Sequence, residues 1–416
     1  MLKDYNKYLE YRNGELYLDG VSLKALAEEF GTPLYVYSAS YIRDRVRAYR
    51  EAFPTALICY AVKANFNPQI IKLVKEEGAG ADIVSGGELY ASLQAGVDPK
   101  KIVYAGVGKT PKEIEYAISS DILMFNVESR MELEVLDQIA ERMGKKVRIA
   151  IRVNPDVDPK THPYISTGMK KSKFGVDIKQ AKEEYEYARN LKNLEVVGIH
   201  CHIGSQILDV SPYIEAVEKI VELYHYLIKN GFDIRYLDIG GGLGIKYKPE
   251  QSNPEPNDLA DAISPILKDV KAKLILEPGR SIVGNSGVLI TRVEFLKDKG
   301  HKHFVIVDAG MNDLIRPAIY DAYHHIVPVE KRDGRYIKTD VVGPICETGD
   351  FLALDRELPE VGRGDYLAVL STGAYGFAMS SHYNVRPRAC ELLVDEGKYR
   401  VIRKREDYAY ILSLNS

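Results

Sequence analysis

The chain has no excess of basic residues and no long apolar run. Its 56 lysines and arginines against 59 aspartates and glutamates give a formal net charge of −3, so no global positive field exists to hold a nucleic-acid backbone or an anionic membrane. No stretch approaches the ~18 uninterrupted apolar residues of a membrane-spanning helix, and residues 1–13 alternate charged and aromatic side chains instead of forming an apolar leader. We therefore expect a cytoplasmic protein that acts on small molecules or proteins, with neither nucleic acid nor membrane as a partner.

Cysteine is scarce as well. The four cysteines are spaced singly without a C-x-x-C pair, at Cys59, Cys201, Cys346 and Cys390. This spacing fits neither a zinc knuckle nor a disulfide framework. The rest of the composition is that of an ordinary globular protein, 45% hydrophobic and 28% charged over 416 residues. That length exceeds the roughly 250 to 300 residues at which a single core usually stops growing, so we expect two domains.

From about residue 57 the chain repeats one pattern, a short apolar run followed by a stretch of helical period. The pattern recurs eight times, with strands predicted at 57–63, 81–85, 101–105, 122–127, 147–153, 196–202, 236–240 and 273–277. Helices are predicted between them, at 68–77, 86–95, 129–143, 179–190, 212–229 and 257–270. Apolar strands that alternate with helices are typical of a covered parallel sheet. Eight such units favour a closed (β/α)8 TIM barrel over an open doubly wound sheet, which would need protected edges.

After about residue 285 the pattern changes to strand-like runs with few helical stretches between them. These runs lie at 287–296, 303–307, 335–342, 366–370 and 399–403. Asp333-Gly334 predicts a hairpin turn among them. We expect an α/β barrel at 39–285 and a mainly antiparallel β domain at 286–416. Residues 1–38 contain two short predicted strands and one helix, at 15–18, 34–37 and 23–30, and are expected to join the β domain.

Barrel enzymes place their active site at the carboxyl ends of the strands, so the residues at each strand end indicate the chemistry. The first strand ends in Lys63, within Tyr60-Ala-Val-Lys-Ala-Asn65. A lysine at the end of an apolar strand must extend to solvent, pair with an acid, or lie desolvated, and in the last state its amine is nucleophilic. Lys63 alone does not decide between these three states.

Strands seven and eight end in a glycine run and in an acid. Successive N–H groups of Gly240-Gly241-Gly242 can converge on an anion, and the loops after these two strands form the recurrent phosphate site of barrels. Tight turns, however, also need glycine. Strand eight ends in Glu277-Pro278-Gly279-Arg280. This places an acid at the barrel mouth beside a guanidinium. The two groups could belong to the active site, or they could form only a local ion pair.

Strand six carries His200 and His202, which point the same way because strand side chains alternate. They could be a metal pair, or a core histidine and an aromatic platform. A metal would need further ligands at other strand ends, where the sequence offers a lysine, glycines and one arginine. We therefore expect no metal. A reactive amine, an anion-binding glycine loop, a flat imidazole and a buried acid together fit one cofactor, pyridoxal 5'-phosphate.

Motifs across almost the whole chain then reveal a family resemblance. The chain resembles the diaminopimelate decarboxylases, in the alanine-racemase-like class of pyridoxal-phosphate enzymes. The motifs that carry the resemblance stand in family order, as Tyr60-Ala-Val-Lys-Ala-Asn65, His202-Ile-Gly-Ser-Gln206, Gly240-Gly-Gly242, Glu277-Pro-Gly-Arg280, Gly343-Pro-Ile-Cys-Glu-Thr-Gly-Asp350 and Gly373-Ala-Tyr375. The resemblance implies a homodimer in which the barrel of one subunit and the β domain of the other share each active site.

The resemblance assigns roles at the cofactor. Lys63 would carry the covalent link to it, and His202 would lie against the pyridine ring. The phosphate and its surroundings would be held by Ser205, Gly241, Gly242, the segment Glu277, Pro278, Gly279 and Arg280, and Tyr375. Glu277 would face the ring nitrogen and keep it protonated, so that the ring accepts the electron pair left by carbon dioxide. The related racemases have an arginine at this position, which makes the ring a weaker electron acceptor. The glutamate at position 277 therefore favours decarboxylation over racemisation for this chain.

The resemblance also assigns roles at the substrate. Cys346 and Glu347 would come from the neighbouring subunit, with Cys346 as the catalytic acid that returns a proton to the α-carbon and Glu347 at the substrate amine. Arg280 and Arg316 offer two guanidinium groups for a second carboxylate. Tyr320 and Tyr375 complete this substrate pocket. Ornithine and lysine carry only an ammonium group at that end, so meso-diaminopimelate, decarboxylated at its D centre to L-lysine, is the expected substrate.

Several alternatives stay open at this point. A decarboxylase of the ornithine, lysine or arginine type, an amino-acid racemase, and a catalytically silent carrier of the cofactor would share most of these residues. A metal hydrolase would use His200 and His202. The connection at 155–174 is longer than the ~12 to 15 residues expected of a loop in a compact domain, which suggests a lid or a dimer contact.

Overall fold

The computed structural model describes residues 2–159 and 173–415. They form two compact units, one of residues 45–245 and 253–281 and the other of residues 1–44, 246–252 and 282–416. The domain limits expected from the sequence, 38/39 and 285/286, differ from these by a few residues and stay a prediction. Much of the connection at 155–174, where a lid or dimer contact was hypothesised, lies outside the described residues.

A closed barrel of eight parallel strands forms the centre of the first unit, as predicted. Its strands are β5 (Leu57–Ala61), β6 (Gly80–Ile83), β7 (Ile102–Tyr104), β8 (Met124–Val127), β9 (Val147–Asn154), β11 (Leu194–His200), β12 (Tyr236–Asp238) and β13 (Lys273–Leu276). Neighbours pair in parallel around the ring, and the pairings of β13 with β5 and of β8 with β9 close it. The short strand β10 (Val176–Asp177) pairs in parallel with the end of β9.

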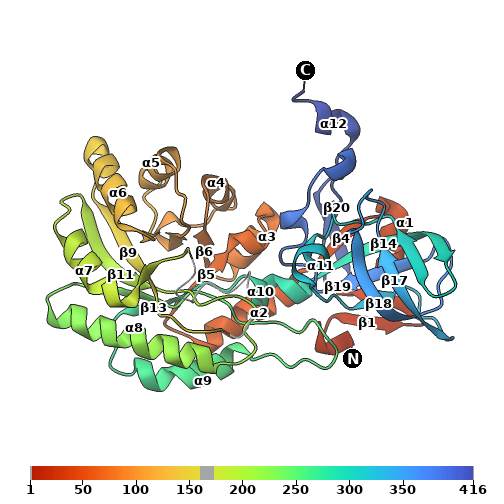
Figure 1. Cartoon of the computed structure of the whole chain (residues 1–416), viewed down its shortest axis with the longest axis horizontal. Coiled ribbons are helices and arrows are strands. Elements are labelled where there is room, and N and C mark those ends of the chain that lie inside the picture. Colours follow the sequence, from red (N-terminus) through yellow and green to blue (C-terminus); the bar gives the residue numbers. More distant parts are fainter. Residues whose placement is uncertain (1, 160–172, 416) are drawn as a thin grey trace. The chain divides into compact units, whose positions relative to one another are not determined.

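Amphipathic helices follow the strands and cover the outside of the barrel (Figure 1). They are α3 (Pro68–Glu76), α4 (Gly86–Gln94), α5 (Pro111–Ser119), α6 (Arg130–Met143), α7 (Ile178–Arg189), α8 (Ser211–Lys229) and α9 (Pro256–Leu267), and α2 (Ala39–Ala52) precedes β5. Polar caps fix where several of them begin: Ser85 accepts from Glu88 N, and Thr110 forms a capping box with Glu113. None of the helices in the described part of the chain is long and apolar enough to cross a membrane.

The second unit is built on a mainly antiparallel sheet, also as predicted. Its strands are β4 (Leu34–Ser38), β14 (Gly287–Asp298), β15 (His303–Val307), β16 (Ile326–Pro328), β17 (Tyr336–Val342), β18 (Phe351–Pro359), β19 (Tyr366–Leu370), β20 (Cys390–Asp395) and β21 (Lys398–Arg403). Only the pairings of β15 with β17 and of β20 with β4 are parallel in this described sheet. β4 lies between β14 and β20, so an N-terminal strand is part of the sheet.

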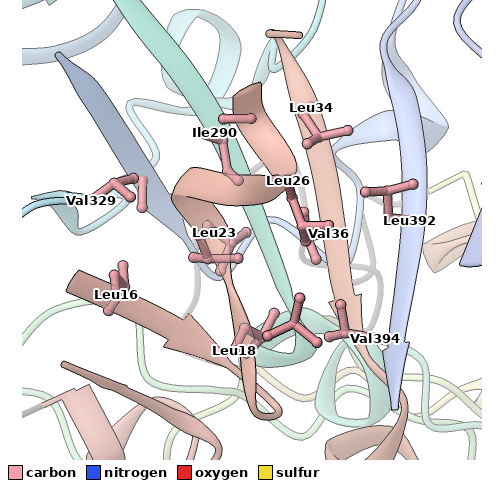
Figure 2. Close-up of a cluster of buried hydrophobic side chains, with 14 of the residues drawn as sticks. Leu16, Leu18, Leu23, Leu26, Leu34, Val36, Ile290, Val329, Leu392 and Val394 are labelled. Carbon is pink, nitrogen blue, oxygen red and sulfur yellow. The ribbon is translucent and has the colours of Figure 1, made fainter. Parts of the chain in front are cut away.

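A smaller sheet and a helix pack against this sheet and bury its apolar face. The smaller sheet contains β1 (Leu9–Arg12), β2 (Glu15–Leu18) and β3 (Val21–Ser22), and the helix is α1 (Leu23–Phe30). Figure 2 shows Leu23 and Leu26 of α1 directed toward Val36 and Ile290 of the large sheet. Each of these side chains is at most 1% exposed. Short helices complete the unit, namely α10 (Arg280–Val283) at its boundary, α11 (Arg316–Tyr320) and α12 (Tyr408–Leu412).

The predicted hairpin at Asp333-Gly334 is wrong. β16, before this turn, pairs with β19, whereas β17, after it, pairs with β15 and β18. An Asp-Gly pair favours a local chain reversal, but partners distant in sequence decide which strands bond. β18 and β20 were not predicted either, although each pairs with a strand adjacent to it in the sequence, β17 and β21 respectively.

Candidate active site

A cavity of about 400 Å³ opens at the carboxyl ends of the barrel strands. This volume lies within the range of small-molecule sites. The cavity is lined by Lys63, Val84, Ala105, Gly106, Val107, Gly108, Arg152, Phe174, His200, His202 and Glu277. Four of the residues singled out in the sequence, Lys63, His200, His202 and Glu277, therefore meet here, as the ends of parallel strands around one barrel require.

Lys63 is paired with an acid. It lies in a short 3₁₀ turn, Val62–Ala64, directly after β5, and its Nζ is 2.5 Å from Oδ2 of Asp82 on β6. Burial, and then the charge of Glu277, raise the pKa of the Asp82 carboxyl to about 7, although Lys63 acts in the opposite direction. Of the three states that the sequence left open for Lys63, the structure has the paired one.

Glu277 is a buried carboxylate with several polar neighbours. It accepts a hydrogen bond from Nδ2 of Asn126 at 3.3 Å, and its Oε2 is 3.3 Å from Nε2 of His200. Burial alone would raise the pKa of Glu277, but His200, Lys63 and His202 together outweigh burial and hold that pKa below its usual range. Burial and the nearby Glu277 raise the pKa of Asp238 well above its ordinary value. The two acids therefore carry one negative charge between them, on Glu277.

His200, Asp238 and Glu277 also form a group whose potential ligand atoms lie within 4.8 Å of one another. This is not the His200 and His202 pair that the sequence offered as a metal pair. Glu277 is hydrogen-bonded to Asn126 and lies beside His200, whereas His200 Nδ1 and Asp238 Oδ2 are buried and have no hydrogen-bond partner among the described residues. The expectation of no metal stays a prediction.

His202 is a neutral ring at the cavity wall. Its Nδ1 accepts a hydrogen bond from Gly241 N at 3.2 Å, which leaves the ring proton on Nε2. Burial and the charge of Arg152 lower the pKa of His202 well below its usual range. A side chain at position 241 would have its Cβ 2.0 Å from the backbone oxygen of Glu277, and Gly242 has φ +110°. The glycine run therefore lets three strand ends approach one another.

The other predicted barrel residues follow in the same loops. Arg280 is 6% exposed, and its Nε and Nη2 donate to Ser205 Oγ at 3.2 and 3.1 Å. Pro278 O accepts from Ala61 N at 3.0 Å, and a Cβ at Gly279 would lie 2.9 Å from the Ala61 Cβ. Ser205, Arg280 and the segment after β13 thus form one hydrogen-bonded surface near Lys63.

The remaining predicted residues belong to the second unit. Arg316 and Tyr320 begin and end α11, and Tyr375 adopts a positive φ of 57°. Cys346 and Glu347 are exposed in the loop after β17. That loop is held at its base, where the Asp350 carboxylate accepts from Met311 N and Ile345 N, each at 2.6 Å, and Asn384 Oδ1 accepts from Cys346 N at 3.0 Å.

Sequence reasoning missed several residues in the cavity wall or directly behind it. Arg152 lines it, is 2.8 Å from Glu128 Oε1 and lies 4.7 Å from the Phe174 ring. Asp82 and Asn126 bind Lys63 and Glu277. A signal was available, because each is a polar residue with an apolar residue on either side of it in a predicted strand, where burial is unfavourable without a partner.

The cavity residues fit pyridoxal phosphate. A lysine amine, a neutral flat imidazole and an ionised acid line one space, and a glycine run without room for a Cβ lies beside it. Asp82 Oδ1, Asn126 Oδ1 and His200 Nδ1 are buried and have no hydrogen-bond partner among the described residues. Fold and site together define a barrel enzyme of the pyridoxal-phosphate-dependent class.

Comparison with known proteins supports this class and narrows it. Residues 39–284 match the family described as "Pyridoxal-dependent decarboxylase, pyridoxal binding domain". The diaminopimelate decarboxylase of Aquifex aeolicus is 71% identical, over 99% of this chain and 98% of its own length. That of Pseudomonas aeruginosa is 51% identical over 95% of each chain. The crystal structure of diaminopimelate decarboxylase from Helicobacter pylori, complexed with L-lysine, is 45% identical with a TM-score of 0.91, covering 94% of this chain and 98% of that one. This chain belongs to the diaminopimelate decarboxylase family, as its motifs suggested.

Proposed function

We propose that the chain decarboxylates meso-diaminopimelate at its D centre, giving L-lysine and carbon dioxide, the last step of lysine biosynthesis, with pyridoxal phosphate as cofactor. The observation that carries this proposal is the cavity in which the Lys63 amine and the Glu277 carboxylate both lie. Such a pair suits a cofactor that is bound covalently through an aldehyde and protonated on its ring.

When bound, pyridoxal phosphate supplies a ring that accepts the electron pair released by the departing carboxylate. The protein residues bind and orient it. Lys63 would hold the aldehyde carbon, and Asp82, whose pKa is about 7, can exchange a proton with the Lys63 amine at neutral pH. Glu277 would keep the ring nitrogen protonated, because it is the ionised member of its buried pair. His202 would lie against the ring as a neutral surface.

The phosphate would be held by polar groups around the barrel mouth. Ser205, Gly241, Gly242 and the segment containing Pro278, Gly279 and Arg280 are the candidates, with Tyr375 from the second unit. Arg280 and Ser205 already form hydrogen bonds with each other, which supports a shared anion site.

The substrate would be bound and protonated by residues of the second unit. Cys346 would return a proton to the α-carbon, and Glu347 would contact the substrate amine. Arg316 and Tyr320, with Arg280, would bind the distal carboxylate. A bidentate guanidinium contact selects a substrate with a second carboxylate over ornithine or lysine, which carry only an ammonium group at that end.

We also propose a homodimer with shared active sites and a cytoplasmic location. Cys346 and Glu347 are exposed in this chain, which suits residues that complete a site on a second subunit. The scattered cysteines suit a reducing compartment.

The test is a visible absorption spectrum of the purified protein with pyridoxal phosphate, followed by product analysis after adding meso-diaminopimelate. We expect a cofactor band, and stoichiometric L-lysine and carbon dioxide. Lys63→Ala should lose the band and the activity, whereas the exposed Lys72→Ala should keep both. Turnover of ornithine in preference to meso-diaminopimelate, or interconversion of alanine enantiomers, would refute the proposal.

A further inference from the structure

Arg316 is a buried arginine with a histidine partner. It is 6% exposed at the start of α11, and its Nη1 lies 2.8 Å from Nε2 of His324. His324 is 0% exposed. Burial of an arginine is costly unless its N–H groups are hydrogen-bonded, so the partner is an essential part of this arrangement.

The partners of His324 fix its tautomer. A guanidinium N–H can only donate, so Nε2 of His324 must accept from Arg316. Nδ1 of the same ring is 2.8 Å from the backbone oxygen of Leu370, which can only accept. His324 is therefore neutral, with its proton on Nδ1. Leu370 belongs to β19 in the middle of the sheet, so the ring is fixed by a rigid element.

Two further contacts hold this pair in place. Arg356 Nη1 donates to the backbone oxygen of His324 at 2.7 Å. The guanidinium carbon of Arg316 lies 4.7 Å from the centre of the Tyr247 ring, and the Tyr247 and His324 rings meet edge to face at 5.3 Å. The plane of the Arg316 guanidinium is thus set by a hydrogen bond at one nitrogen and an aromatic face.

We infer that His324 is a positioning residue for Arg316, and that it thereby sets the preference for a substrate with a distal carboxylate. The inference rests on the proposed function, in which Arg316 binds that carboxylate. A bidentate contact needs a guanidinium with one fixed plane, and an arginine that is already oriented loses less conformational entropy on binding. A simple diamine would gain nothing from this orientation.

The experiment compares two polar replacements of His324. His324→Gln keeps an acceptor near the position of Nε2, whereas His324→Asn keeps a donor near Nδ1 and loses the acceptor for Arg316. We expect His324→Asn to raise KM for meso-diaminopimelate about tenfold, the usual weight of one hydrogen bond to a charged group, with a smaller change in kcat. His324→Gln should recover most of the loss. His324→Phe, which lacks both nitrogens, should resemble His324→Asn.

Equilibrium binding gives a readout independent of turnover. The holoenzyme is titrated with L-lysine, which retains a carboxylate, and with cadaverine, which has none. His324→Asn should weaken L-lysine about tenfold and leave cadaverine unchanged. Equal weakening of both amines, or no difference between the Asn and Gln variants, would overturn the inference. If His324→Phe fails to fold, the Asn and Gln pair still decides.

Arg316→Ala separates this inference from the proposed function. If Arg316→Ala leaves L-lysine binding unchanged, the proposed role of Arg316 is wrong. If Arg316→Ala weakens binding but His324→Asn does not, only the inference about His324 is wrong. Because His324 is inferred to act through Arg316, adding His324→Asn to Arg316→Ala should cause no further loss.

Discussion

Buried ionisable side chains at the barrel mouth set one another's charge. Glu277 is held as a carboxylate beside His200 and Asn126, while the neighbouring Asp238 is held protonated. Asp82 lies between these states, since burial raises its pKa although Lys63 opposes it. The same low-polarity environment thus produces a fixed anion, a fixed neutral acid and a group that can exchange a proton near pH 7.

Asp82→Asn tests that proton exchange. The amide keeps the size of Asp82 but cannot take a proton from Lys63, so we expect kcat to fall about a hundredfold, the lower range for loss of an acid–base group. The cofactor should still bind. Steady-state kinetics and the absorption spectrum check this, with the exposed Asp233→Asn as the control. A kcat within about threefold of wild type would show that Asp82 only fills space.

Asp313 gives a prediction about stability and pH. Burial raises the pKa of Asp313 to about 7. The folded state therefore binds more protons than the unfolded state between about pH 4 and 7, and this group lowers stability as the pH rises through that window. Asp313→Asn cannot ionise, and its amide oxygen can still accept from Gly310 N, the bond that Asp313 Oδ2 makes at 3.0 Å. Urea unfolding at several pH values should show Asp313→Asn gaining stability over wild type as the pH rises from 4 to 7. A constant difference would contradict this.

At the residue scale, the sequence identified those site residues that stand at the end of a predicted strand. Lys63, His202 and Glu277 were found because strand ends meet at one edge of a barrel. Asp82 and Arg152 were missed because they lie within strands, and the pattern gives no partner for a buried charge. Only the folded arrangement brings Asp82 to Lys63 and Arg152 to Glu128.

At the scale of elements, local signals were sufficient for the barrel but not for the β unit. Apolar runs that alternate with stretches of helical period predicted all eight barrel strands, because each helix and strand there packs on its neighbours in the chain. Helix α5 was not among the predicted helices, although the Thr110 and Glu113 capping box marks its start. In the β unit β4 pairs with β14 and β20, far away in sequence, and no local pattern encodes such pairings.

Gly241→Ala tests the close approach of the loops after β12 and β13. A methyl group at 241 would lie 2.0 Å from the oxygen and 2.8 Å from the carbonyl carbon of Glu277, both backbone atoms that cannot rotate away. We expect a shift of Glu277 and at least a tenfold weaker affinity for pyridoxal phosphate, consistent with the cost of forcing atoms into a packed core. Gly334→Ala, where nothing lies within 4 Å, is the control. Equal cofactor affinity in both variants would contradict the argument.

At the scale of the whole molecule, the predicted site residues divide between two units of the chain. Lys63, His202 and Glu277 belong to the barrel unit, whereas Cys346 and Arg316 belong to the β unit. The proposed reaction needs both groups, because Lys63 would hold the aldehyde carbon of the cofactor, whereas Cys346 would return a proton to the α-carbon of the substrate. The proposed homodimer meets this need by taking the two groups from different subunits.

Mixing two inactive variants tests this arrangement. Lys63→Ala and Cys346→Ala should each be nearly inactive alone. After subunit exchange between equal amounts, about half of the dimers contain one of each variant, and each such dimer has one site with both residues intact. The mixture should therefore recover about a quarter of wild-type activity, measured as carbon dioxide released, with light scattering to confirm the dimer. If both residues came from the same chain, every site would lack one of them and mixing would restore nothing.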